Sequence, residues 1–481
     1  MVGIIKSPHL VLWSASLLLV LPAIVAAPMM HDSFWIDWVW ADQFTAELAQ
    51  GNLYPRWLPR SHGGLGSPVF YFYPPLAFYV SGAFGLSGLS TYASIVATFW
   101  VALLGSGYAM YLWLRGFAPF PLLGAFLYMA APYHLFDFYG RGAQAEFLAI
   151  AFIPLVAWSM REDRRAVLAV SYAGLILSHL PLALLVSLFL VAPYAVYLRK
   201  PFRFAAPLML GIGLSAMYLW PAFTLERYRD AASLWTNPHL QPEHWGLFAG
   251  NGSWARGIRF MFAAILLSSV PVIAAIYFSG QRSLAIYAAI CCAVAAGFVP
   301  GIWSLPLIAK VQFPFRLLPI VEFALATGTA MFIRSWLLLV WFPALLLSAM
   351  SVLPTERQIG WTIADLSRLH PDVPENLPPG DRPFSWPSRW ALATAVANPG
   401  AILWFPSWRT ACRAELLIPA RCAKRLEITK SELVGLLITL LSFALLFYPA
   451  VKRGVGHRLG KRRGRSEKWR ARLDSNQRPQ D

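Results

Sequence analysis

The 481-residue chain has few charged residues and few cysteines, and it lacks the short motifs that bind nucleotides. Asp, Glu, Lys and Arg together make up 13% of the residues, against about 25% in soluble proteins. No Walker loop, HExxH motif or dinucleotide fingerprint is present, since the glycines of GGLGS (63–67) are followed by neither Lys nor a strand–helix pattern. The composition argues against a soluble protein, and the missing motifs argue against direct use of ATP or NAD.

Long apolar runs fill most of the chain instead. Apolar residues account for 58% of the sequence, and runs of about 20 residues are long enough to cross a ~30 Å hydrocarbon core as helices. The formal net charge of +17 lies mainly in the C-terminal tail and in short loops. That distribution orients a membrane protein and is not typical of a nucleic-acid-binding surface. The sequence therefore predicts an all-α polytopic membrane protein.

Basic loops orient the chain, because they remain in the cytoplasm. Twelve spans with both termini in the cytoplasm satisfy all of them, and the first helix is expected to stay uncleaved. The aromatic segment 69–88 is assigned to the outer interface, since a span there would move the basic loops 160–165 and 198–203 outside. The predicted spans are 9–28, 92–113, 119–135, 147–160, two helices meeting at 178–181, 204–224, 259–278, 284–303, 317–333, 335–353 and 432–450.

The spans divide the chain into four parts. Residues 1–354 form a transmembrane domain with a large first outer loop that carries interfacial helices. Residues 355–431 are polar and rich in short alternating stretches, which predicts a small β-rich outer domain. Residues 432–450 form the last span, and residues 451–481 form a basic tail that is expected to be disordered.

The four cysteines fall into two pairs. Cys291 and Cys292 lie within an apolar span and are expected to pack in the core. Cys412 and Cys422 flank an apolar run of the outer domain, in a compartment that permits disulfides. They form either a disulfide bridge or two free thiols.

Notable polar residues gather on the predicted outer side. The first outer loop begins with HDSFWIDWVWADQF (31–44), in which Asp32, Asp37 and Asp42 are five residues apart and so fan around any helix axis. Each ionisable group alone is readily explained as a solvated cap or an interfacial anchor. As a set at membrane depth, where charge is costly, they are candidates for function. The other outer candidates are His31, Arg56, Asp137, Arg141, Glu146, His179, Gln312 and Arg316.

Carboxylates and arginines at an outer face suit one kind of group transfer. Nucleotide-activated donors stay in the cytoplasm, so an outer reaction needs a donor that crosses as a lipid, such as a polyprenyl-phosphate sugar. Arginines would bind its phosphate through charge-assisted hydrogen bonds. One carboxylate would act as general base on the acceptor hydroxyl. A second would orient the acceptor or help to hold a divalent cation such as Mg²⁺ or Mn²⁺, the one cofactor this chemistry suggests.

Seven stretches add a resemblance to a known family. They are HD (31–32), GNLYPRWLP (51–59), GSPVFYFYPPL (66–76), YGRGAQAEFLA (139–149), LSHLP (177–181), LSAMYLWPA (214–222) and QFPFR (312–316). In this order they resemble bacterial polytopic membrane proteins labelled 6-pyruvoyl-tetrahydropterin synthase-related membrane domain, which have type-C (GT-C-like) glycosyltransferase architecture. The resemblance covers about residues 25–330. It implies a catalytic acid at Asp32 and a second acid at Asp137 or Glu146, and it implies no pterin chemistry.

These observations predict a cell-envelope glycosyltransferase of the bacterial cytoplasmic (inner) membrane. It would use a lipid-linked sugar donor and a lipid or envelope glycan acceptor, with no nucleic-acid partner. Asp37 and Asp42 are interpreted as solvated partners in an interfacial segment anchored by tryptophans. The catalytic candidates are Asp32, Asp137 and Glu146, and the substrate-binding candidates are His31, Arg56, Arg141, His179, Gln312 and Arg316.

Two alternatives from other classes remain open. A transporter or flippase for a lipid-linked glycan would show broken helices and polar groups near the middle of the membrane. A non-catalytic envelope assembly protein would need neither feature.

Overall fold

The computed structural model describes most of the helical part of the chain. The described residues are 7–26, 33–61, 66–229, 256–299, 301–332, 335–352 and 428–446, with a few positions between 230 and 255 and residue 373. Their regular structure is helical, and the bridge between Leu58 and Ser67 is isolated. The part of the chain that the structure describes is therefore all-α.

The N-terminal half begins with a long apolar helix and continues through shorter ones. Its elements are α1 (Pro8–Ala26), α2 (Phe34–Ala49), α4 (Val69–Phe72), α5 (Leu76–Leu86), α6 (Thr91–Leu114), α7 (Pro121–Met129), α8 (Pro132–Phe136), η1 (Asp137–Arg141), α9 (Gln144–Arg161) and α10 (Arg165–Ser178).

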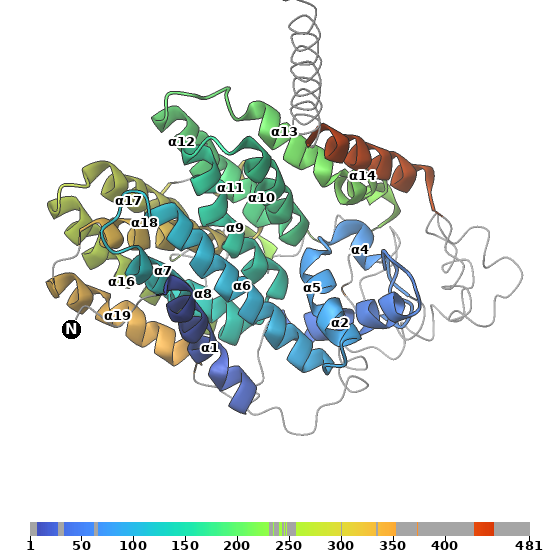
Figure 1. Cartoon of the computed structure of the whole chain (residues 1–481), viewed down its shortest axis with the longest axis horizontal. Coiled ribbons are helices and arrows are strands. Elements are labelled where there is room, and N and C mark those ends of the chain that lie inside the picture. The colour runs from blue at the N-terminus through green and yellow to red at the C-terminus, as the bar shows by residue number, and fades with distance from the viewer. Residues whose placement is uncertain are drawn as a thin grey trace, which may run out of the picture.

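The second half continues in the same way. Its elements are α11 (Leu180–Val186), η2 (Ser187–Val191), α12 (Ala192–Tyr197), α13 (Ala205–Leu214), α14 (Ala216–Thr224), η3 (Glu226–Tyr228), α16 (Arg256–Phe278), α17 (Arg282–Ala296), η6 (Ile302–Ser304), η7 (Ala309–Val311), η8 (Pro314–Leu317), α18 (Leu318–Met331) and α19 (Ser335–Val352). Residues 430–446 form one more helix, drawn in red beside α13 and α14 in Figure 1.

Each predicted span overlaps one helix or consecutive helices over its described residues, but the count of twelve spans is not confirmed. Among the described residues, three stretches are long and apolar enough to cross a membrane: Pro8–Val25, Thr91–Leu114 and Leu180–Tyr197. A fourth candidate is the pair α13 and α14, whose axes bend by 73° at Ser215. The chain is a membrane protein that is all-α over the residues described, and its number of spans stays a prediction.

The aromatic segment 69–88 forms two short helices instead of one long one. Tyr73 and the following prolines separate α4 from α5, because proline lacks the N–H that would continue the helix. The 11 residues of α5 rise about 17 Å, which is too short for a ~30 Å hydrocarbon core. This arrangement fits the predicted interfacial placement.

The centre of the molecule is a bundle in which α9 packs against α6 and α10, and α10 packs against α13 (Figure 1). At one end, α2 packs against α5 and α6. Trp38 and Trp40 of α2 are buried within the protein, and Trp40 lies 5.0 Å from Tyr73 between ring centroids. The interpretation of these two tryptophans as interfacial anchors is therefore wrong, because protein side chains cover them.

Other predicted parts lie largely outside the described residues. These are the β-rich outer domain with Cys412 and Cys422, of which only residues 373 and 428–431 are described, and the tail 451–481. Cys291 is buried and Cys292 is partly buried in α17, and both are free cysteines, as expected for core packing.

Candidate functional site

A sharp change of helix geometry precedes α9. The chain passes from α8 through the π-helical turn η1 to Gly142, which has φ +64°. A Cβ atom on Gly142 would lie 2.5 Å from Cβ of Phe34, so glycine is needed here for both conformation and space. The turn places Asp137 and Arg141 on one side, facing the first turn of α9. Such π-turns are frequent at functional sites.

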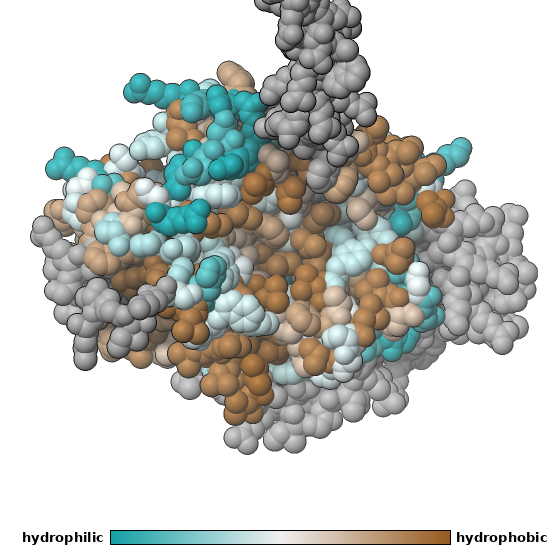
Figure 2. All heavy atoms as spheres, viewed as in Figure 1, coloured by the Kyte–Doolittle hydropathy of each residue, from teal (hydrophilic) through white to brown (hydrophobic). Residues whose placement is uncertain are grey.

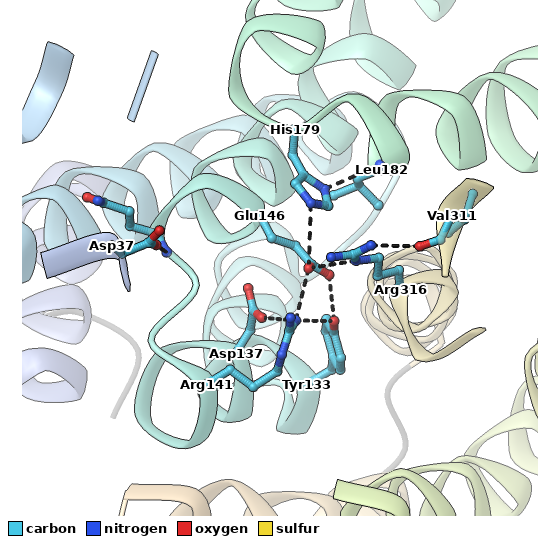
Figure 3. A network of polar contacts seen from close by, with 10 residues as sticks. Asp37, Tyr133, Asp137, Arg141, Glu146, His179, Leu182, Val311 and Arg316 are labelled. Atoms are coloured by element: carbon cyan, nitrogen blue, oxygen red, sulfur yellow. Dashed lines mark hydrogen bonds and ion pairs between the residues drawn. The ribbon is translucent and has the colours of Figure 1, made fainter. Parts of the chain in front are cut away.

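Glu146 lies at the centre of a buried ionic cluster (Figure 3). Its Oε2 accepts hydrogen bonds from a terminal nitrogen of Arg141 at 2.9 Å and from Nε of Arg316 at 3.1 Å. Its Oε1 accepts from the hydroxyl of Tyr133 at 2.6 Å. Arg141 also donates to Oδ1 of Asp137 at 2.7 Å. All five side chains are buried, and we call this set, together with His179, the ionic cluster.

Aromatic rings and a backbone turn hold both guanidinium groups. Arg316 lies 4.6 Å above the ring of Phe313 and donates to the carbonyl oxygen of Val311 at 2.6 Å. Arg141 lies 5.1 Å from the ring centroid of Phe315. Gln312 has φ +69° and lies between Val311 and Phe313, directly before these aromatic residues. The candidate Gln312 thus lies in the chain turn four residues before Arg316.

His179 lies between α10 and α11, just before the apolar stretch that begins at Leu180. Its Nδ1 accepts a hydrogen bond from the backbone N–H of Leu182 at 3.3 Å, and its Nε2 lies 3.9 Å from Oε2 of Glu146. Burial first, and then the charge of Arg316, lower the pKa of His179 to about 3, although Glu146 opposes the shift. The ring is therefore neutral near pH 7.

Stability should respond to pH through His179. The folded-state pKa of His179, about 3, lies below the ordinary 6.5. The contribution of the neutral ring to the free energy of unfolding is therefore complete above pH 6.5 and is lost as the pH falls toward 3. Between pH 7.5 and 5 the loss is about 2 kcal/mol. We expect thermal unfolding of the detergent-solubilised protein to show this loss, and the variant His179→Gln to show a flatter profile. Parallel pH profiles for the two proteins would exclude the assignment.

Asp37 is buried, and so the interpretation of this residue as a solvated partner is wrong. Its exposed fraction is 1%, and its Oδ2 accepts a hydrogen bond from the backbone N–H of Gln144 at 3.1 Å. This bond joins α2 to the start of α9, two residues before Glu146. A sequence signal existed, because Ala41 and Phe44 follow Asp37 at helical spacing on the same buried face.

We expect Asp37→Ala to lower the free energy of unfolding by about 2 kcal/mol, since the buried N–H of Gln144 then loses its hydrogen bond to a charged carboxylate and keeps only its bond to the carbonyl oxygen of Gly142. Asp42→Ala is the matched control from the same helix. Asp42 pairs with the half-exposed Arg60, and an exposed pair contributes less than about 1 kcal/mol. Unfolding of both variants in detergent measures the difference. Equal losses would mean that the two aspartates are equivalent after all.

Tyr133 and Glu322 are two further buried groups that the sequence analysis missed. Glu322 lies in α18, and its Oε1 accepts a hydrogen bond from the backbone N–H of Tyr133 at 2.6 Å. The signal for Glu322 was its position as an acid inside an apolar run. Tyr133 carried no signal of its own, because tyrosine is common near membrane interfaces.

The structure brings together five of the nine predicted site residues. Asp137, Glu146, Arg141, His179 and Arg316 meet in the ionic cluster, and Gln312 lies beside it. Arg56 lies elsewhere: it pairs with Glu432 at the start of the last helix and stacks on Tyr54. His31 and Asp32 lie outside the described residues.

The donor set of the cluster does not suit a divalent cation. Asp137 and Glu146 already bind guanidinium groups, and a cation would have to displace them. Among the described residues, no group of three or more His, Cys, Asp or Glu side chains lies close enough to hold a metal ion. What the cluster can do is hold two guanidinium groups in fixed orientation, an arrangement that suits the recognition of an oxyanion.

Fold and site together define a helical membrane protein with a buried ionic cluster at one end of its bundle. No family model matches the chain, and no curated protein sequence matches it significantly. Membership of the family that the motifs resemble therefore stays a prediction.

Solved structures similar to the chain include the following two. One is the cryo-EM structure of the arabinofuranosyltransferase AftD from Mycobacteria, with 13% identity, a TM-score of 0.45, and coverage of 72% of this chain and 26% of that chain. The other is the crystal structure of ArnT from Cupriavidus metallidurans in the apo state, with 18% identity, a TM-score of 0.43, and coverage of 92% and 78%. The chain thus spans about a quarter of the length of AftD. Values of this size define neither an activity nor a substrate for this chain.

Proposed function

We propose that the chain is a cell-envelope glycosyltransferase that takes a sugar from a polyprenyl-phosphate donor at the outer face of the bacterial cytoplasmic membrane. One observation carries the proposal. Five predicted site residues come from three separate segments of the sequence, and they meet in one buried cluster. Chance placement of ionisable groups would not join them, because burying charge without a partner is costly.

In this proposal Arg141 and Arg316 bind the phosphate of the donor. Each guanidinium has a planar array of N–H donors that matches the oxygens of a phosphate. Glu146 accepts hydrogen bonds from both arginines, so it is a positioning residue rather than a base. Phosphate oxygens would compete with the carboxylates for the same N–H groups.

Asp32 is proposed as the general base that removes the proton of the acceptor hydroxyl. It precedes Asp37 by five residues, and five extended residues span at most about 18 Å. Asp37 is in turn bonded to Gln144 beside the cluster. This short separation is compatible with a role for Asp32 at a donor held by Arg141 and Arg316. The same outer loop would position the acceptor.

A transporter or flippase for a lipid-linked glycan is the second candidate. Two observations favour it: the 73° bend between α13 and α14 is a broken apolar helix, and Glu322 is a buried acid inside α18. Both features occur in transporters. They rank second because Glu322 accepts a backbone hydrogen bond from Tyr133, which is a structural role.

Membrane vesicles with and without the protein, given radiolabelled polyprenyl-phosphate sugars, separate the candidates. We expect label to move from the donor to an envelope lipid or glycan only when the protein is present, and Arg316→Lys to reduce this transfer by 10-fold or more, since lysine cannot bind bidentately. Label that changes leaflet without changing molecule would establish the flippase. The absence of both results would overturn both candidates and leave an assembly role.

A further inference from the structure

A cavity lies at the other end of the bundle from the ionic cluster. Its volume is about 350 Å³, it is open on one side, and residues of α6, α9, α12, α17 and α18 line it. Helix α9 carries Glu146 in the ionic cluster and first lines the cavity at Ala157, eleven residues later, which is about 16 Å along a helix. The cavity is therefore separate from the ionic cluster and from the proposed transfer reaction.

The walls of the cavity are apolar and aromatic. Its volume falls within the ~300–1,000 Å³ usual for small-molecule sites. Polar groups are few: Arg161, Gln281 and Ser283 lie at one side, and the hydroxyl of buried Thr327 already binds Trp113. The main apolar lining is formed by Trp113, Phe117, Leu190, Tyr194, Leu284 and Phe323. An alkyl chain suits these walls better than a sugar or a nucleotide.

Arg161 fixes a positive charge at the cavity. Its guanidinium lies 5.1 Å from the ring centroid of Trp113 and 4.9 Å from that of Phe117. It also donates to the carbonyl oxygen of Trp113 and pairs with the exposed Glu162. The side chain remains 19% exposed. A ligand that lies among the aromatic residues would meet this cation at its polar end.

The surroundings of the cavity are basic as well. The connections 161–165 and 198–203 lie at this end and contain six basic and two acidic residues. Figure 2 shows hydrophilic residues gathered near α12. Basic loops identify the cytoplasmic side, whose leaflet carries anionic lipids that attract such segments.

We propose that this cavity binds an anionic phospholipid of the cytoplasmic leaflet. One acyl chain lies among the aromatic side chains, and the phosphate group lies at Arg161. A zwitterionic lipid of the same chain length binds less well, because its ammonium group is repelled by the basic connections. The site does not depend on the proposed glycosyltransferase activity.

Photo-crosslinking of the reconstituted full chain tests the proposal. Photoactivatable phosphatidylglycerol and phosphatidylcholine, each with the reactive group on an acyl chain, are compared in vesicles of equal composition, and labelled peptides are mapped by mass spectrometry. We expect at least 5-fold more labelling of the cavity by phosphatidylglycerol. Ser283→Trp fills the cavity and should reduce that labelling at least 5-fold. Ile286→Trp is the control, since Ile286 is on the same helix, is 51% exposed and does not line the cavity.

Four results would overturn the proposal. Equal labelling by the two lipids would mean that the headgroup charge does not determine binding. Equal labelling of the Ser283→Trp and Ile286→Trp variants would mean that the lipid does not bind in the cavity. If glycerol phosphate reduced the labelling as strongly as unlabelled phosphatidylglycerol does, the cavity would be a site for a free phosphate that needs no acyl chain. Arg161→Gln should lower the preference for phosphatidylglycerol while phosphatidylcholine labelling persists, and an unchanged preference would likewise contradict it. Unfolding temperatures of all variants confirm that they are folded.

Discussion

Replacing Glu146 by Gln is expected to destabilise the protein by about 3–5 kcal/mol, because two buried arginines lose their shared counter-charge. Glu146 is 1% exposed and receives hydrogen bonds from Arg141, Arg316 and Tyr133. Water cannot replace the carboxylate at this depth. The measurement is denaturant or thermal unfolding of the protein in detergent, with the parent chain alongside.

Glu162→Gln is the matched control, since Glu162 follows α9 directly and its side chain is 42% exposed. Its loss should cost less than about 1 kcal/mol. The double variant Glu146→Gln with Arg316→Gln should recover part of the lost stability, because it removes one of the unpaired charges. Additive effects of the two substitutions would mean that the two residues do not interact.

Replacing Asp32 by Asn is expected to reduce sugar transfer by about 10²–10⁴-fold, the usual contribution of a general base. Asparagine keeps the size of the side chain but cannot take a proton from the acceptor hydroxyl. The assay is transfer of radiolabel from a polyprenyl-phosphate sugar by purified protein. The unfolding temperature should stay the same, which separates a chemical role from a structural one.

Asp42→Asn serves as the control for Asp32→Asn. Asp42 lies in the same stretch of sequence but bonds to Arg60 and Thr91, so its substitution should leave transfer within about 2-fold of the parent. Full activity of Asp32→Asn would end the assignment of Asp32 as base. A loss in both variants would point instead to the outer loop as a whole.

The sequence predicted the helices well because their signals are local. Apolar runs and basic loops depend only on neighbouring residues, and segments such as 92–113 and 147–160 correspond closely to α6 and α9. The interfacial assignment of 69–88 likewise fits the two short helices found there. The same reasoning did not foresee the bend at Ser215, because no proline marks it and the apolar run continues through it.

The candidate site was predicted in part. Asp137, Arg141 and Glu146 lie within ten residues of one another, so their proximity could be expected. Asp37 was misjudged because its partner, the backbone N–H of Gln144, is 107 positions away along the chain. Arg56 carried the same outer-loop signal as Arg316, yet it pairs with Glu432, 376 positions later.

By itself the sequence determined that this is a helical membrane protein and which of its loops carry ionisable groups, since hydropathy and charge are properties of consecutive residues. Only the tertiary structure decided which of these groups share a site. Glu146 and Arg316 are 170 positions apart, and they meet because α9 and η8 pack at the same end of the bundle. The buried pairing follows from that packing, because a carboxylate and a guanidinium without water must satisfy one another.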